Sequence, residues 1–203
     1  MKIYLASGNQ HKLSELRIAL QQAGLDGCEV FSADLIGGMP VVDETGDTFE
    51  ANAILKAEAL RPQGSEEAFY LADDSGIEID HLDGQPGIRS ARYAGDTCSD
   101  KANNEKVLSE MTEVPDGERG CRFRCVLALV GEGLCKTFSG TCDGTLLQEY
   151  RGTGGFGYDP LFLPKESDST FAEISSEEKA KISHRARALG KLMEYLRERL
   201  ALN

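Results

Sequence analysis

The chain has 203 residues, of which 40% are apolar and 28% charged, a composition typical of a globular protein with room for one α/β domain. Its net charge of −12 repels phosphate backbones, so general nucleic-acid binding is disfavoured. No run reaches the roughly 20 apolar residues that span a bilayer, and the N-terminal apolar run is too short for a signal peptide, so we expect a cytoplasmic protein that contacts no membrane.

The first third of the sequence predicts a strand followed by two helices. Residues 2–6 are a short apolar run and predict the strand. Leucines at spacings of three and four predict a helix over residues 10–23, and Gly24 is placed to end it. A second helix is expected from an N-cap at Thr48 to Arg61, because a proline follows.

The middle of the sequence predicts several strands and one helix. Residues 69–72 predict a buried strand that ends abruptly at DDSG, and GIEID predicts a separate antiparallel strand because its isoleucines alternate with charged residues. Residues 99–111 predict a helix, and residues 121–130 and 134–139 predict a hairpin. Cys121 and Cys125 share one side of their strand with Phe123, so we expect small core residues instead of disulfides.

The C-terminal part predicts an extended segment from Pro160 and two helices. Ser175 and Glu178 form a capping-box pattern for a short helix, and regularly spaced leucines predict a last helix over residues 183–200. Strands and helices in mixed order predict an α/β fold with a mixed β-sheet. We expect one domain over residues 1–203.

Two segments in the first third carry groups that suit a phosphate and a cation. In SGNQHK a strand ends and a helix begins, so free N–H groups and Lys12 could bind an anion, whereas the alternative is an ordinary turn capped by Ser7 or Asn9. In DETGDTF and NAILK, Glu44 and Lys56 could supply a metal ligand and a phosphate contact. The alternative there is a solvated loop and a surface lysine.

LADDSG places two adjacent carboxylates, Asp73 and Asp74, after an apolar run. Buried carboxylates are costly unless they are paired or coordinated. Alternation along the strand sends the two side chains to opposite sides, so one can be structural and the other catalytic. A Mg²⁺ site built from one or two carboxylates and substrate phosphates is the natural use of such a pair.

GTGGFGYDP begins with a match to G-x-G-x-x-G, the dinucleotide-binding pattern. A true fingerprint follows a strand and opens a helix, whereas an Asp-Pro pair and an extended segment follow here. We therefore interpret the stretch as a glycine-rich turn that displays Phe156, Tyr158 and Asp159, so that an aromatic ring could stack on a flat base and Asp159 could accept an N–H from that base. The alternative is a hairpin whose aromatic residues lie in the core.

SSEEKAKISHRAR concentrates cations in an acidic chain. With Ser183 as the cap of the last helix, His184 and Arg185 would lie in its first turn and could face a ligand together with Lys179. The alternative for an isolated His-Arg pair is a surface position.

Taken in order, these five segments resemble the inosine triphosphate pyrophosphatase family, the non-canonical purine nucleoside triphosphate pyrophosphatases. The matching pieces are SGNQHK, ETGDTF with NAILKA, LADDSGIEID with PGIRSARYAG, GTGGFGYDP and EEKAKISHRARAL, which span residues 7–189. The resemblance implies a two-lobed α/β fold around a long mixed sheet flanked by helices, with the active cleft between the lobes. It also implies a homodimer and Mg²⁺-dependent hydrolysis of dITP, ITP and XTP to the monophosphate and pyrophosphate, which cleans the nucleotide pool.

The resemblance also assigns roles to residues. Asp74 is the expected proton acceptor, and Glu44 and Asp74 are the expected Mg²⁺ ligands. Substrate binding is expected from Ser7, Gly8, Asn9, Gln10, His11, Lys12 and Lys56 on the triphosphate, from Ser75, and from Phe156, Gly157, Tyr158, Asp159, Lys179, His184 and Arg185 on the nucleoside. The chain departs from the family at Ala51, where members often carry a glutamate that could bind metal or complete a capping box with Thr48.

Two other functions stay open at this stage. A nucleotide pyrophosphatase of the Maf-like group would share the N-terminal phosphate turn but should lack the SHR and GGFGYDP segments. A non-catalytic nucleotide sensor would bind without releasing pyrophosphate, and the intact DDSG and Glu44 argue against it. For the favoured function, selectivity is expected where Arg185 or backbone N–H groups meet the 6-oxo group of the base and reject the amino group of adenine.

Overall fold

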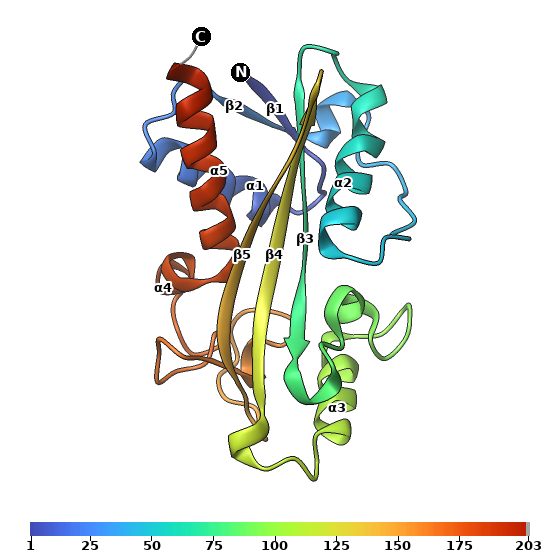
Figure 1. Cartoon of the computed structure of the whole chain (residues 1–203), viewed down its shortest axis with the longest axis vertical. Coiled ribbons are helices and arrows are strands. Elements are labelled where there is room, and N and C mark those ends of the chain that lie inside the picture. Colours follow the sequence, from blue (N-terminus) through green and yellow to red (C-terminus); the bar gives the residue numbers. More distant parts are fainter. Residues whose placement is uncertain (202–203) are drawn as a thin grey trace. The chain divides into compact units, whose positions relative to one another are not determined.

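The computed structural model describes residues 1–201, whose helices and strands are shown in Figure 1. The strands are β1 (Lys2–Leu5), β2 (Glu29–Ser32), β3 (Phe69–Ile79), β4 (Gly120–Gly131), β5 (Leu134–Leu146) and β6 (Phe162–Pro164). The helices are α1 (Gln10–Gln22), α2 (Phe49–Leu60), α3 (Asp100–Glu110), α4 (Ser176–Ile182) and α5 (His184–Ala201). The strands form one sheet in the order β2-β1-β3-β4-β5-β6, with β1 parallel to β2 and β3, and β6 antiparallel to β5. The predicted α/β fold with a mixed sheet and flanking helices is confirmed.

The chain divides into two compact units. The first comprises Met1–Asp74, Cys125–Gly140 and the residues from Arg187 onward, and the second comprises Ser75–Arg124 and Thr141–Ala186. Strands β3, β4 and β5 and helix α5 therefore contribute residues to both units. The single domain and the cleft between lobes that were expected from the sequence stay predictions.

The first unit has a core of leucines from its two longest helices. Leu13, Leu16 and Leu20 of α1 are buried, as the spacing predicts, and they share one apolar cluster with Leu192 and Leu196 of α5. Helix α1 ends where expected, because Gly24 adopts a φ of 66° that other residues rarely take. A smaller cluster packs residues of α2 against β3.

The second unit has its own core, formed by β3, α3, the start of β4, the end of β5 and the region of β6. Its members include Ile77 and Ile79 of β3, Met111 at the end of α3, and Phe123 of β4. Cys121 joins this cluster, while Cys125 is buried in the first unit, and none of the six cysteines, which lie within the described residues, forms a disulfide. The expectation of small core cysteines is confirmed.

One strand prediction was wrong: β3 runs without a break from Phe69 to Ile79 instead of ending at DDSG. The two carboxylates stay inside the strand because lysines neutralise them. Lys12 Nζ lies 2.7 Å from Asp73 Oδ1, and Lys56 Nζ lies 2.7 Å from Asp74 Oδ1. Two further differences are β2, which no sequence pattern predicts, and β5, which continues to Leu146 beyond its predicted end.

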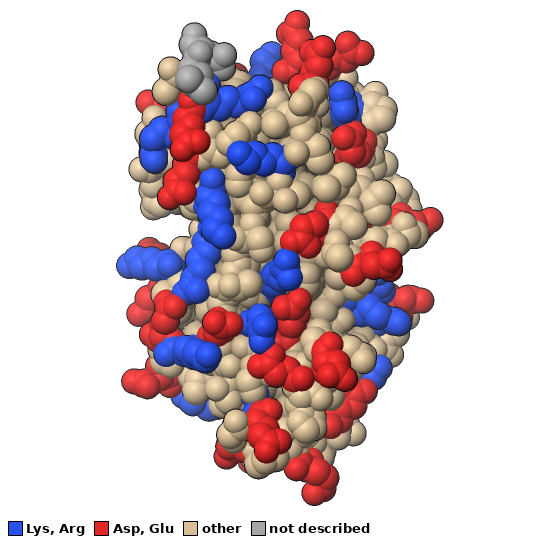
Figure 2. All heavy atoms as spheres, in the orientation of Figure 1, with Lys and Arg blue, Asp and Glu red and all other residues tan. Residues whose placement is uncertain are grey.

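Charged residues of both signs occur together on the surface. Figure 2 shows Lys and Arg side chains interspersed with Asp and Glu on the visible face, so the net charge of −12 does not make that face uniformly acidic. A local group of cations is therefore compatible with the acidic composition. Among residues 1–201, no helix combines the length and apolar character needed to cross a membrane.

Candidate functional site

The turn from β1 into α1 is a capped helix start. Asn9 Oδ1 accepts hydrogen bonds from the backbone N of His11 at 2.8 Å and of Lys12 at 3.4 Å, and Ser7 Oγ accepts one from the N of Asn9 at 3.1 Å. These caps use N–H groups that would otherwise meet an anion. The predicted residues Gly8, Asn9, Gln10 and His11 are exposed at this turn. Lys12 is therefore the strongest cation that the turn can offer to a phosphate.

The first unit contains a cavity of about 240 Å³ where cations and carboxylates meet. Four predicted site residues line it, namely Ser7, Lys12, Glu44 and Lys56, and they are joined by Asp73, which was not among the predicted site residues. Met39, Pro40 and Val42 add an apolar wall. We call this cavity the lysine pocket.

Ion pairs already connect the charged groups of this region. Lys56 Nζ lies 2.7 Å from Asp74 Oδ1 and 3.6 Å from Glu44 Oε1, so it bridges the two expected metal ligands. Lys12 is paired with Asp73. The two neighbouring carboxylates therefore have different lysine partners, and their expected placement on opposite sides of the strand stays a prediction.

Asp74 is an incompletely compensated carboxylate. It is only 7% exposed, and its Oδ2 has no hydrogen-bond partner among the described residues. Burial raises the pKa of Asp74, and the neighbouring Lys56 offsets this only in part. A buried carboxylate oxygen of this kind, beside a second carboxylate from Glu44, suits an additional cation.

Helix α2 holds the loop that carries Glu44. Asn52 Oδ1 accepts a hydrogen bond from the N of Gly46 at 2.8 Å, and Thr48 Oγ1 accepts one from the N of Ala51 at 3.1 Å. Ala51 is therefore the N3 residue, as predicted, and its methyl group offers no ligand. Within residues 1–201, no group of three or more His, Cys, Asp or Glu side chains could hold a metal.

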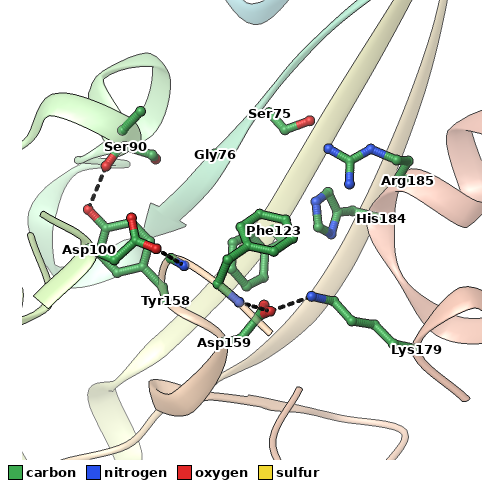
Figure 3. A pocket seen from close by; sticks show the side chains of 13 residues that line it. Ser75, Gly76, Ser90, Asp100, Phe123, Tyr158, Asp159, Lys179, His184 and Arg185 are labelled. Atoms are coloured by element: carbon green, nitrogen blue, oxygen red, sulfur yellow. Dashed lines mark hydrogen bonds and ion pairs between the residues drawn. The ribbon is translucent and has the colours of Figure 1, made fainter. Parts of the chain in front are cut away.

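The second unit contains a cavity of about 140 Å³, shown in Figure 3, which we call the aromatic pocket. It brings together all the predicted site residues of this unit: Ser75, Phe156, Gly157, Tyr158, Asp159, Lys179, His184 and Arg185. Five residues that were not predicted also line the cavity, namely Gly76, Ser90, Ala91, Asp100 and Phe123. The pocket combines aromatic rings with cations from α4 and α5.

The glycine-rich stretch forms a turn over residues 152–159, which we call the aromatic turn. Phe156 is 63% exposed, whereas Tyr158 is buried and donates a hydrogen bond from its hydroxyl to the O of Ser90 at 2.9 Å. The prediction of an exposed aromatic ring is therefore confirmed for Phe156, whereas Tyr158 follows the alternative of an aromatic residue in the core. Gly155 is required by space as well as by its φ of 71°, since a Cβ there would lie 2.1 Å from Asp159 Oδ2.

Asp159 fastens the aromatic turn to α4. Its buried Oδ2 accepts hydrogen bonds from the N of Phe156 at 2.9 Å and from Lys179 Nζ at 2.5 Å. The Lys179 ammonium lies 4.8 Å from the ring centroid of Phe156 and 5.0 Å from that of Phe171. Asp159 therefore has a structural ion pair, and its expected hydrogen bond to a base stays a prediction.

The start of α5 supplies the other side of the aromatic pocket. Ser183 Oγ accepts a hydrogen bond from the N of Ala186 at 3.2 Å, which confirms its predicted capping position. His184 is buried and stacks on Phe123, with ring centroids 4.8 Å apart and an interplanar angle of 13°. Figure 3 shows His184 and Arg185 on the same side of the pocket, facing the aromatic residues.

Comparisons with known proteins agree on one family. The Ham1 family model matches residues 3–195. A protein of Opitutus terrae named dITP/XTP pyrophosphatase is 46% identical over 199 residues, which cover 96% of this chain and 98% of that protein. A protein of the same name from Bacillus subtilis is 47% identical over 193 residues, or 95% of each chain. The solved structure of the Staphylococcus aureus Ham1 protein has a TM-score of 0.88 and 38% identity, covering 98% of this chain and 100% of that chain.

Proposed function

Because the chain belongs to the Ham1 family, we propose that it hydrolyses the non-canonical purine nucleoside triphosphates dITP, ITP and XTP to the monophosphate and pyrophosphate. Relatives named dITP/XTP pyrophosphatase match nearly the whole chain, which supports this substrate class. The observation that carries the chemistry is the arrangement of Asp74, Lys56 and Glu44. A buried carboxylate with a free oxygen next to a cation and a second acid suits phosphoryl chemistry.

In this proposal the triphosphate binds in the lysine pocket. Lys12 and Lys56 neutralise its charge, and Asp74 accepts the proton of the attacking water. We extend the proposal to Mg²⁺ held by Glu44 and Asp74, since carboxylates together with substrate phosphates are typical ligands of that ion. When bound, Mg²⁺ would supply further charge neutralisation on the phosphates.

The nucleoside binds in the aromatic pocket. Phe156 offers an exposed ring for stacking, and Arg185 lines the same pocket, so we expect it to donate to the 6-oxo group that hypoxanthine and xanthine share. Adenine carries an amino group in place of the 6-oxo group, so its N–H donor would face the donor of Arg185. Guanine also carries the 6-oxo group, so another contact must reject its 2-amino group.

The proposal is tested by measuring pyrophosphate release from ITP, XTP, dITP, GTP, dATP and dTTP with and without Mg²⁺. We expect Mg²⁺-dependent release from ITP, dITP and XTP at rates well above those for the other three. Release chiefly from dTTP would favour a Maf-like activity. Tight ITP binding without any release would indicate the nucleotide sensor.

Replacing Lys56 by Met tests the proposed metal ligands without an activity assay. Lys56 lies between Glu44 and Asp74, so its ammonium would repel a metal ion bound by these carboxylates. Its removal should therefore tighten the binding of Mn²⁺ alone by roughly tenfold, the effect expected from one partly screened charge interaction. The same change should weaken ITP binding, because a phosphate loses its cation. Isothermal titration calorimetry measures both affinities, with the exposed Lys165→Met as the matched control. Unchanged Mn²⁺ affinity would argue that Glu44 and Asp74 do not bind the metal.

Replacing Arg185 by Ala tests base selectivity. If Arg185 donates to the 6-oxo group, the ratio of kcat/KM for ITP to that for ATP should fall by about tenfold or more, because the donor that rejects adenine is lost. The exposed Arg197→Ala on the same helix is the control. An unchanged ratio would assign the reading of the base edge to another group.

The proposal also includes a homodimer and a cytoplasmic location, as the resemblance and the sequence suggest. Light scattering of the purified chain measures the first. A monomer at micromolar concentration would contradict it without affecting the proposed reaction.

A further inference from the structure

Two side chains of α3 hold one residue of the aromatic turn. Asp100 Oδ2 accepts a hydrogen bond from the N of Gly157 at 2.6 Å, and Asn104 Nδ2 donates one to the O of Gly157 at 2.9 Å. Asp100 and Asn104 are four residues apart and so share one face of the helix. Both backbone polar groups of Gly157 are therefore bound by α3, and we call Asp100 and Asn104 the α3 clamp. Figure 3 shows the Asp100 carboxylate beside Tyr158, with its bond to the turn.

The α3 clamp is itself well supported. Asp100 lies in the first turn of α3, behind the N-cap Ser99, whose Oγ accepts a hydrogen bond from the N of Ala102 at 3.2 Å. The N-terminus of a helix favours a carboxylate, and a bond from N–H to an ionised oxygen is stronger than a neutral one. Asn104 is buried. The clamp thus places an exposed charged acceptor and a buried donor at the turn.

The place of the Phe156 ring depends on this backbone. At 63% exposure the ring has little packing beyond its contact with the Lys179 ammonium, 4.8 Å from its centroid. The N of Phe156 is held by Asp159 at 2.9 Å, and the next N in the chain, that of Gly157, is held by Asp100. Two consecutive N–H groups are therefore bound by carboxylates from two different elements. Loss of either bond would free one side of the residue that carries the exposed ring.

We propose that Asp100 and Asn104 are positioning residues for the nucleoside: by fixing Gly157 they hold the Phe156 ring in the orientation in which a purine stacks on it. The inference rests on the proposed function, because it takes the occupant of the aromatic pocket to be a purine. Neither residue lines the lysine pocket. The α3 clamp should therefore govern affinity for the base and leave the binding of phosphates unchanged.

The first experiment compares two ligands on Asp100→Ala. The Kd for IMP should rise about tenfold, as partial loss of a base–aromatic stack would produce, while the Kd for Mg²⁺-tripolyphosphate stays within about twofold. The KM for ITP should rise with the Kd for IMP, and kcat should change by less than about threefold. Asp96→Asn, an exposed change in the loop before α3, is the control and should alter neither ligand.

Further variants separate positioning from a general effect on folding. Asp100→Asn keeps an oxygen that can accept from Gly157 and should retain most of the IMP affinity, whereas Asn104→Asp sets a carboxylate against the carbonyl of Gly157 and should lower it as much as Asp100→Ala. In a Phe156→Ala background, Asp100→Ala should have no further effect on IMP binding, since the ring it positions is gone.

Three results would overturn the proposal. The first is an IMP affinity within twofold of that of the parent chain in both Asp100→Ala and Asn104→Asp. The second is an additive effect of Asp100→Ala on IMP binding in the Phe156→Ala background. The third is a loss of tripolyphosphate binding that parallels the loss of IMP binding, because it would indicate a general loss of structure. Failure of the proposed function looks different, because the unmodified chain would then release no pyrophosphate from ITP.

Discussion

Asp74→Asn should lower kcat/KM for ITP by about 10²- to 10⁴-fold, the range typical of losing a general base, and should leave the fold intact. Asparagine has the same shape, and its side-chain oxygen can still accept the bond from Lys56, 2.7 Å away in the native chain. The variant loses the negative charge that the proposed reaction needs for the proton and for the metal. Since burial raises the pKa of Asp74, removing the charge also removes a desolvation cost, and the melting temperature should not fall.

The measurement pairs pyrophosphate release at saturating Mg²⁺ with thermal unfolding of the same preparations. Asp26→Asn, an exposed change in the turn after α1, is the matched control and should behave as the parent chain does. Turnover within threefold of the parent would remove Asp74 from the proposed mechanism. A large loss of both activity and melting temperature would instead indicate a structural role for its ion pair with Lys56.

The same aspartates show why one part of the fold was predictable and another was not. Helix α1 follows from local spacing and a glycine at its end, which act within one segment. The continuity of β3 depends on Lys12 and Lys56, which lie 61 and 18 residues away from their carboxylate partners. Without those partners two adjacent aspartates look like the end of a strand, because burying them would be costly. Tertiary pairing overrides the local pattern here.

The candidate site divides in the same way. Residues in compact motifs, such as Phe156 to Asp159 and the pair His184 and Arg185, could be predicted to lie together within their own segments, and the structure places them in one pocket. Asp100 could not be found this way, because its partner Gly157 is 57 residues away and nothing in the local pattern connects them. The sequence pattern assigns no site role to Asp73, because only the ion pair with Lys12 shows where its side chain points.

Arg119 presents the largest expected effect on stability, because it is a buried cation bound by backbone carbonyls. It is 2% exposed, and its guanidinium donates hydrogen bonds to the O of Met111 at 2.7 Å, Val114 at 3.2 Å, Leu146 at 2.8 Å and Leu147 at 3.2 Å. Met111 is the C-cap of α3, where a helix end favours a cation. Arg119 therefore ties the end of α3 to the residues at the end of β5.

Arg119→Met should lower the free energy of unfolding by about 3–5 kcal/mol, because four carbonyls, three of them in buried hydrogen bonds, lose their donor and methionine offers none in return. Urea unfolding followed by circular dichroism measures the change.

The control is Arg122→Met, in the strand β4 that begins directly after Arg119. The half-exposed side chain of Arg122 pairs with Asp80 and Asp143, and its loss should lower the free energy of unfolding by about 1 kcal/mol or less. Arg119→Lys should fall between the two, since an ammonium cannot reach carbonyls in the planar geometry of the guanidinium. If Arg119→Met unfolds within 1 kcal/mol of Arg122→Met, the carbonyls must find other donors, and α3 is held by its apolar face alone.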